Sequence, residues 1–182
     1  MTKKRLIDIA EVYSGVHLSR FIDSKSDLKP VIRNKFKDDG IFEFEYKNIS
    51  NNLNPKYYSK KDDIVISLSE PNTVTRLNKE GYVITMNFAV IRLKEGYNTS
   101  FFYHLLKSNY FLSELHKLRE GGALKIIKVA DLRKIKFNIP NLETQNKYGM
   151  FLDLIDNKIK LEKKLIQYQN NYKEAIIENI YK

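Results

Sequence analysis

The sequence predicts an α+β fold in which a mixed, curved β-sheet with flanking helices precedes a long C-terminal α-helix of the coiled-coil type. Three observations lead to this class. Short segments rich in β-branched and aromatic residues lie before residue 100. Apolar residues then take on helical spacing, and the C-terminal segment repeats apolar residues at alternating steps of four and three.

The N-terminal half is expected to hold one short helix and several strands. Residues 6–12 (LIDIAEV) predict a helix that ends at the turn formed by Ser14 and Gly15. Residues 21–40 are polar and contain turn residues, so we expect an irregular stretch. Strands are predicted at residues 41–46, 64–68, 82–86 and 88–93.

From residue 100 the apolar residues recur at steps of three and four, which predicts a helix as far as Leu118. Gly121 and Gly122 are expected to end it. A short turn at residues 130–132 and an alternating strand at residues 135–139 then complete a domain at residues 1–141.

Residues 142–182 are predicted to form mainly one helix of roughly 38 residues, about 57 Å long. Its apolar residues follow the seam of a coiled coil. Because the preceding domain is too small to cover such a helix, most of the apolar face requires a partner helix. The predicted dimerisation residues are Leu154, Lys158, Leu161, Leu165, Tyr168, Tyr172 and Ala175.

Positive charge is concentrated in the predicted domain. The chain carries 32 Lys or Arg and 22 Asp or Glu residues, a net charge of +10. Seven basic and six acidic residues lie in residues 142–182, which leaves +9 in residues 1–141. A domain with this surplus suits nucleic acid, whereas a helix of balanced charge suits a protein partner.

Composition excludes several other classes. The chain has no cysteine, which excludes disulfides and thiolate metal sites. Its start becomes charged too soon for a signal peptide, and no apolar run approaches the roughly 18 residues of a membrane span. We therefore expect a cytoplasmic protein with no membrane partner.

Three groups of residues have a feature of enzyme sites. Residues 54–57 (NPKY) are similar to the motif with which amino-methyltransferases hold an amine, but no glycine-rich cofactor loop accompanies them, so a turn is preferred. Asp39 with residues 45–47 (EYK) resembles a nuclease triad, but the acids are close together, and a charged strand is preferred. The three histidines lack ligand spacing. We expect no catalytic residue, no metal and no cofactor.

Two loops combine basic residues with small or hydrogen-bonding ones. The loop after the strand at residues 64–68 offers the donors and acceptors that base edges require, although a surface loop without a partner is equally compatible with its spacing. In the second loop two glycines permit close backbone approach and flanking cations suit phosphate, although a simple helix stop is the alternative. The predicted DNA-binding residues of the two loops are Ser69, Asn72, Thr73, Arg76, Arg119, Gly121, Gly122 and Lys125.

An ordered set of segments resembles the specificity subunits of Type I restriction–modification systems. The later part of the set comprises residues 101–106 (FFYHLL), 121–122 (GG), 129–132 (VADL), 135–140 (IKFNIP), 143–145 (ETQ) and 151–159 (FLDLIDNKI). The earlier part comprises residues 6–15, 60–67 (KKDDIVIS) and 86–92 (MNFAVIR). The sequence departs from the family at Asp62, where glycine is usual, and at Thr144, which is inserted between Glu143 and Gln145.

The resemblance implies a target-recognition domain at residues 1–141 that docks on double-stranded DNA, and a helix at residues 142–182 that pairs antiparallel with its partner. It adds Asn87, at the start of the strand after the recognition loop, to the DNA-binding residues. It also implies an adenine-methylating modification subunit as partner, with a restriction subunit as a further candidate. Chemistry would then reside in those partners, and this chain would be non-catalytic.

Family members usually carry two recognition domains and two long helices, whereas this chain has one of each. The resemblance therefore implies a half-subunit that acts as a homodimer and reads two identical half-sites. Two alternatives stay open. One is a stand-alone DNA-binding or interaction protein of a mobile element that modulates a host restriction complex. The other is a nuclease or methyltransferase fragment without its catalytic half, which cofactor binding would support.

Overall fold

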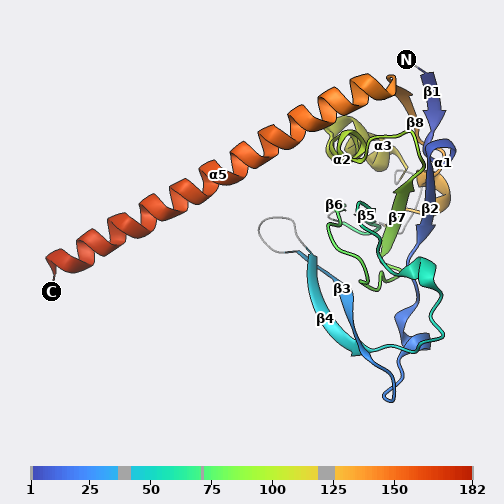
Figure 1. The fold of residues 1–182 in the computed structure, drawn as a ribbon, viewed down its shortest axis with the longest axis horizontal. Coiled ribbons are helices and arrows are strands. Elements are labelled where there is room, and N and C mark those ends of the chain that lie inside the picture. The colour runs from blue at the N-terminus through green and yellow to red at the C-terminus, as the bar shows by residue number, and fades with distance from the viewer. Residues whose placement is uncertain (1, 37–41, 71, 119–125, 182) are drawn as a thin grey trace.

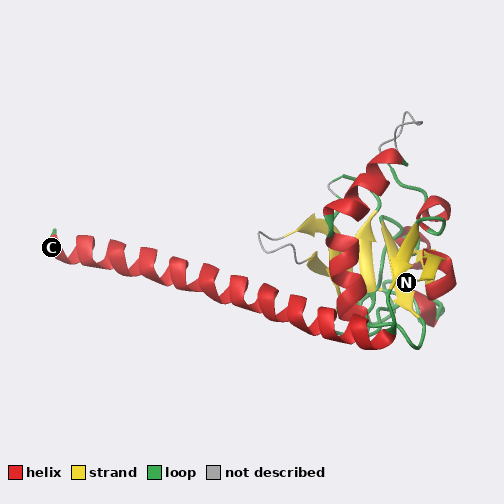
Figure 2. Ribbon diagram, turned by 90° about the horizontal axis from the view of Figure 1, so that it is seen from above, coloured by secondary structure: helices red, strands yellow, loops and turns green. Residues whose placement is uncertain are grey.

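A helix of 39 residues leaves a β-rich domain and stands clear of it for most of its length (Figures 1 and 2). The computed structural model describes residues 2–36, 42–70, 72–118 and 126–181, with only the backbone for residues 34–36. The α+β class predicted from the sequence is confirmed. Among the described residues, no helix combines the length and apolar content needed to cross a membrane.

The centre of the domain is an antiparallel sheet with the strand order β2-β7-β5-β6. These strands are β2 (Ala10–Ser14), β7 (Phe88–Leu93), β5 (Ile64–Ser67) and β6 (Val74–Arg76). The predicted strands at residues 64–68 and 88–93 are confirmed. The prediction for residues 6–12 is correct only for one helical turn, α1 (Leu6–Ile9), because residues 10–12 pair with β7 instead.

Side chains of β5 and β7 alternate between two apolar cores, which explains why these strands read as continuous apolar runs. Ile64 and Ile66 belong to one core, under the helices. Val65 and Val90 belong to the other, together with Phe42. The central sheet is therefore buried on both faces.

Two helices cover the first face, α2 (Thr99–Lys107) and α3 (Asn109–Lys117), where the sequence had predicted one. Ser108 separates them with extended backbone, and its side chain accepts a hydrogen bond from the backbone N–H of Phe111. The residue whose side chain caps α3 therefore also ends α2. The spacing of apolar residues does not reveal this cap, so the sequence predicted one continuous helix.

The remaining strands form two antiparallel pairs. β1 (Thr2–Arg5) pairs with β8 (Lys136–Ile139), which follows the turn of helix α4 (Val129–Leu132). β3 (Leu28–Phe36) pairs with β4 (Phe42–Asn48) to form a ribbon at one end of the domain (Figure 1).

The ribbon shows two errors of prediction. β3 lies within residues 21–40, which were wrongly expected to be irregular because basic residues and Pro30 hide its alternation. Conversely, the strand predicted at residues 82–86 is wrong, since Val83 and Thr85 form only isolated bridges. The carbonyl of Pro30 accepts a hydrogen bond from the backbone N–H of Val83. This isolated bridge joins β3 of the ribbon to the segment that precedes β7.

The C-terminal helix α5 (Leu142–Ile180) confirms the long helix predicted from the sequence, and at 1.5 Å per residue it measures about 58 Å. It begins after Pro140, where the Asn141 side chain accepts the backbone N–H of Thr144 at 2.9 Å. Its first turns pack against α2. Every described residue from 157 to 181 is exposed.

Candidate nucleic-acid interface

Three segments meet at Leu68, at the end of β5. The backbone N–H of Leu68 donates to the carbonyl of Asn87 at 2.9 Å, and its own carbonyl accepts the N–H of Ile127 at 2.9 Å. The loop after β5 therefore lies between the start of β7 and the segment that follows the predicted glycine loop. The predicted residues Arg119, Gly121, Gly122 and Lys125 lie outside the described residues.

The loop after β5 is shaped by its own hydrogen bonds. The Asn72 side-chain amide donates to the carbonyl oxygens of Ser67 and Ser69 at 2.8 and 3.3 Å. The Ser67 N–H donates to the carbonyl of Thr73, and its hydroxyl donates to that of Ser69. Thr73 is half-buried and Asn87 is exposed. Asn72 thus fixes the loop that presents its neighbours.

Arg76 lies elsewhere, at the far end of the same hairpin. Its guanidinium is 3.4 Å from the Asp153 carboxylate of α5 and also donates to the Ser100 hydroxyl. It sits over the ring of Tyr103, 5.5 Å from the centroid. In this position the guanidinium contacts α5, whereas its contact with a base stays a prediction.

Lys128, a basic residue that the sequence prediction overlooked, adjoins the convergence point. Residues 119–136 contain six basic and two acidic residues, a net charge of +4. Lys128 is exposed, one position after Ile127. Arg133 serves the fold instead, because its guanidinium donates to the Val12 carbonyl at 2.8 and 2.6 Å. The net positive charge of this segment is the signal by which Lys128 could have been predicted.

A buried ion pair supports β5 from behind. Asp63 is 1% exposed, and Arg92 donates to its two oxygens at 2.8 and 2.7 Å. This hydrogen bonding raises the pKa of Arg92. Burial raises the pKa of neighbouring Tyr13 to about 12. The carboxylate also accepts the backbone N–H of Lys60, so the pair fixes the turn that leads into β5.

The same turn places Asp62 in the left-handed region, with φ of 69°. Asp62 is the residue at which the sequence departs from the glycine usual in specificity subunits. Glycine adopts this conformation without a steric penalty, whereas Asp adopts it at some cost. The backbone at this position thus has a conformation that glycine adopts more readily than Asp.

The anchor of α5 is polar. Asp153 accepts hydrogen bonds from the Ser100 hydroxyl at 2.6 Å and lies 2.9 Å from His104 Nε2. Burial opposes ionisation of Asp153, but the hydrogen bonds from Ser100 and His104 and the charge of Arg76 lower its pKa. Gln145, which is 2% exposed, accepts the backbone N–H of Asn98 at 3.0 Å.

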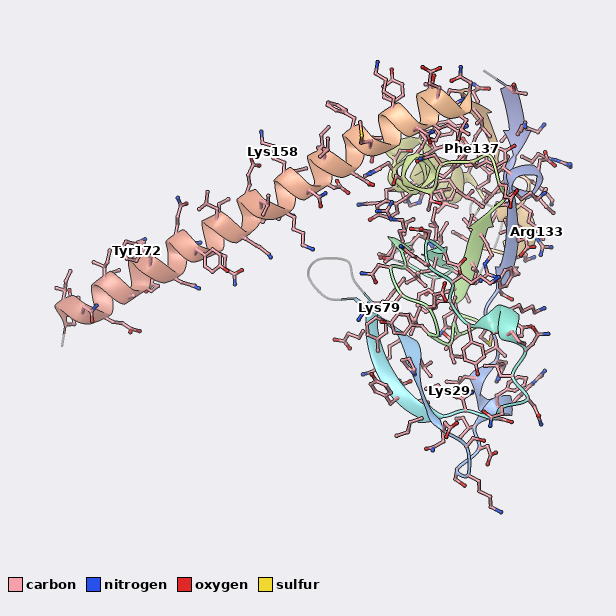
Figure 3. The ribbon with its side chains drawn as sticks, in the orientation of Figure 1. Lys29, Lys79, Arg133, Phe137, Lys158 and Tyr172 are labelled. Atoms are coloured by element: carbon pink, nitrogen blue, oxygen red, sulfur yellow. The ribbon has the colours of Figure 1, made fainter. Side chains whose placement is uncertain are left out.

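The predicted dimerisation residues all lie on α5, and the large apolar ones are exposed. Leu161 is 66% exposed and Tyr172 is 70% exposed. Figure 3 shows Lys158 and Tyr172 on the part of the helix that stands clear of the domain. Pairing of two chains through these residues stays a prediction.

The residues compared with enzyme sites take ordinary structural positions. Asn54 caps the 3₁₀ turn Pro55–Tyr57 by accepting the backbone N–H of Lys56. Glu45 pairs with Lys47 at 2.9 Å, and Asp39 lies outside the described residues. In the described part of the chain, no group of three His, Cys, Asp or Glu side chains is arranged to hold a metal.

A family model described as the Type I restriction modification DNA specificity domain matches residues 1–168. The chain belongs to this family. The match covers the whole domain and most of α5, so the family resemblance found in the sequence is confirmed.

The relatives of this specificity-domain chain are longer. The MjaVIII specificity subunit of a Type I restriction enzyme from Methanocaldococcus jannaschii is 29% identical over 121 residues, which cover 62% of this chain and 28% of that protein.

Solved structures share the fold. The HsdS subunit from Thermoanaerobacter tengcongensis has a TM-score of 0.68 at 15% identity, covering 90% of this chain and 44% of that one. The S subunit from M. genitalium has a TM-score of 0.58 at 16% identity, covering 87% and 40%. A chain from work on complex assembly and conformational transition of the type I R-M system has a TM-score of 0.66 at 18% identity, covering 90% and 40%. This specificity-domain chain therefore spans less than half the length of these relatives.

Proposed function

We propose that the protein is the non-catalytic DNA-recognition subunit of a Type I restriction–modification complex and that two copies pair through α5. The observation that carries this proposal is the family match, which includes both the domain and the helix. Because the chain spans 40% and 44% of two solved subunits, two copies would supply most of the length of one such subunit. The name of the archaeal relative, a specificity subunit, supports the same function.

Recognition of DNA is assigned to the surface around Leu68. Ser69, Thr73 and Asn87 would contact base edges, since hydroxyl and amide groups match their donors and acceptors, and Asn72 would keep the loop in shape. Lys128, with Arg119 and Lys125, would contact phosphates and position the domain. All of these proposed contacts lie within residues 1–141, which we propose as one recognition domain.

The projecting helix supports a protein interface. Large apolar side chains on α5, including Leu161 and Leu165, are more than half exposed. An exposed stripe of this length is typical of a helix that packs against a partner. An antiparallel pair would place one domain at each end and leave further surface for a modification subunit, with a restriction subunit as an additional partner.

Co-purification from the native host tests this function. A tagged chain should recover an adenine-methylating modification subunit, and the complex should enrich one bipartite sequence from a pool of random duplexes. The matched control is the Leu161→Asp, Leu165→Asp variant, which should lose the bipartite preference because charge in an apolar seam is costly. Recovery of only another system's restriction complex would favour a mobile-element regulator. Methyl transfer by the isolated chain would contradict the non-catalytic assignment.

A further inference from the structure

We propose that a polar clasp fixes the angle at which α5 leaves the domain and thereby sets the spacing of the two recognition domains in a pair. The second half of this proposal rests on the proposed function, whereas the first half does not. The clasp comprises Asp153 and Asp156 on α5 with Arg76, Ser100, His104 and Lys107 on the domain.

The clasp joins two carboxylates on one face of α5 to Arg76 of β6 and to the imidazole and ammonium groups of His104 and Lys107 on α2. Asp153 faces Arg76 at 3.4 Å and His104 at 2.9 Å. Asp156, one turn later, lies 3.5 Å from Lys107 and 3.9 Å from the second ring nitrogen of His104. Because one ring nitrogen of His104 faces Asp153 and the other faces Asp156, the ring sits between the two carboxylates. The His104 side chain is only 11% exposed.

Few apolar side chains hold this helix: among the described residues of α5 that are not exposed, Leu152 is apolar, and the others are Thr144, Gln145, Gly149, Asp153 and Asp156. The buried residues of α5 are Gln145 and Gly149, whereas Leu142, Tyr148 and Phe151 are each more than 40% exposed. Apolar contact is non-directional, but hydrogen bonds and ion pairs require a defined geometry. The direction of α5 is therefore set mainly by its polar partners.

α5 contacts the domain at two places. Two separate contacts are needed to fix the direction of a rigid helix. The first is at Gln145 and Gly149, where an added Cβ at Gly149 would lie 2.8 Å from the backbone nitrogen of Phe101. The second is the clasp, about 12 Å further along the axis. Beyond Asp156 the helix is exposed to its end.

The helix amplifies any movement at the clasp. With the pivot near Gln145, a shift of about 2 Å at Asp153 becomes about 9 Å at Ile180, since the distances along the helix are roughly 12 and 52 Å. A displacement of this size is about two to three base-pair steps of DNA, at roughly 3.4 Å per step. Moreover, Arg76 ends β6, the strand that follows the loop with the proposed base contacts, so the clasp is connected to that loop through β6.

The angle can be measured without DNA. Because the chain has no cysteine, spin labels can be placed at Lys79→Cys in the domain and Asn170→Cys on α5, both exposed positions. Labelled chains are diluted in excess unlabelled chain, and the distance within one chain is measured by double electron–electron resonance. The test variant carries Asp153→Asn and Asp156→Asn. The control carries Glu162→Gln and Glu174→Gln, which remove the same charge from exposed positions of α5.

The parent and the control should give one narrow distance, and the clasp variant a broadened distribution or one displaced by several ångströms. Asp156→Asn alone should give a smaller change and serves as the test if the double variant does not fold. Equal distributions in parent and clasp variant would overturn the clasp.

The role in spacing is tested with the bipartite duplex selected by the complex. Adding or removing one base pair between its halves should weaken binding of the parent about tenfold, but that of the clasp variant about threefold or less. Equal sensitivity in both would overturn the role in spacing even if the distance changes. If the parent selects no duplex, the proposed function fails together with that role, and the distance measurement still decides the clasp.

Discussion

The backbone N–H of Ile127 donates a 2.9 Å hydrogen bond to the carbonyl oxygen of Leu68. This bond joins segments nearly sixty positions apart in the sequence, the hydrogen-bonding loop after β5 and the basic segment around Lys128. Groups suited to base edges and a cation suited to phosphate therefore adjoin one convergence point. The two kinds of contact predict different effects on DNA binding.

Thr73→Ala and Asn87→Ala should each reduce the preference for the selected duplex over random DNA by about 1–3 kcal/mol, because a base contact specifies sequence. Lys128→Ala should instead weaken binding to all duplexes and lower the salt slope by about one, because a phosphate contact releases counterions. Fluorescence titration at several salt concentrations, with the modification subunit present, measures both quantities.

Lys160→Ala, at an exposed cation on α5, is the control for a general loss of charge. Equal losses on selected and random DNA for every variant would contradict the division of roles. If none of the domain variants loses binding, the DNA surface lies elsewhere, and the basic residues of the region before and within β3 become the candidates, namely Arg20, Lys25, Lys29, Arg33 and Lys35.

Gly149→Ala should lower the free energy of unfolding by about 1–2 kcal/mol. The added Cβ would lie 2.5 Å from Asn98 Oδ1, the atom that caps α2 by accepting the N–H of Phe101. The gain in helix propensity, about 1 kcal/mol, is smaller than the cost of the clash and the lost cap together. Urea unfolding measures the change, and Asn157→Ala, at an exposed position of the same helix, should not destabilise. An increase for Gly149→Ala would contradict the close approach.

Asp62→Gly should raise the free energy of unfolding by about 0.5–1 kcal/mol, because glycine relieves the left-handed conformation at φ of 69°. Asp62→Ala retains a Cβ in that conformation and should give no such gain. Thermal unfolding of the two variants beside the parent distinguishes them. A lower melting temperature for Asp62→Gly would show that its side chain stabilises the turn by more than the backbone cost.

Acid should weaken the attachment of α5. The pKa of Asp153 is lowered from 3.8: burial opposes this shift, but hydrogen bonds from Ser100 and His104 and the charge of Arg76 outweigh it. A lowered folded-state pKa means that stabilisation is present above about pH 4 and is lost as pH falls through the lower value. Asp156 and Lys107 complete the charged surroundings.

Urea midpoints measured from pH 6 to pH 3 should therefore fall less steeply for Asp153→Asn than for the parent. Glu162→Gln, which removes an exposed carboxylate of α5, is the control and should follow the parent. Parallel curves for the parent and Asp153→Asn would contradict the lowered pKa.

The sequence predicted correctly those helices and strands that depend mainly on residues close together in the chain. The seam from Leu154 to Ala175 and the apolar run of β5 and β7 gave the long helix and the central strands. Ala10 and Val12 were misassigned to a helix, because their pairing with Leu93 and Ile91 depends on a strand some eighty positions away. β3 was missed since its alternation includes charged residues and a proline that only the ribbon accommodates.

The candidate site shows the same limit. The residue types around Ser69 and Thr73 identified the loop, but not that Asn72 closes it or that Lys128 adjoins it. Arg76 was predicted to contact bases together with the hydrogen-bonding residues of this loop, and that contact stays a prediction. A strand direction and a distant carboxylate, Asp153, determine where its guanidinium lies, and neither is visible in local sequence.

The most direct measurement of the central claim is the solution mass of the unmutated chain by multi-angle light scattering at micromolar concentration. The chain has a mass of 21.5 kDa, and pairing through α5 predicts twice that value. Leu161→Asp with Leu165→Asp should return the mass of one chain, since unpaired charges in an apolar seam cost several kcal/mol. A single-chain mass for the unmutated protein would contradict the account of two half-subunits joined through their long helices.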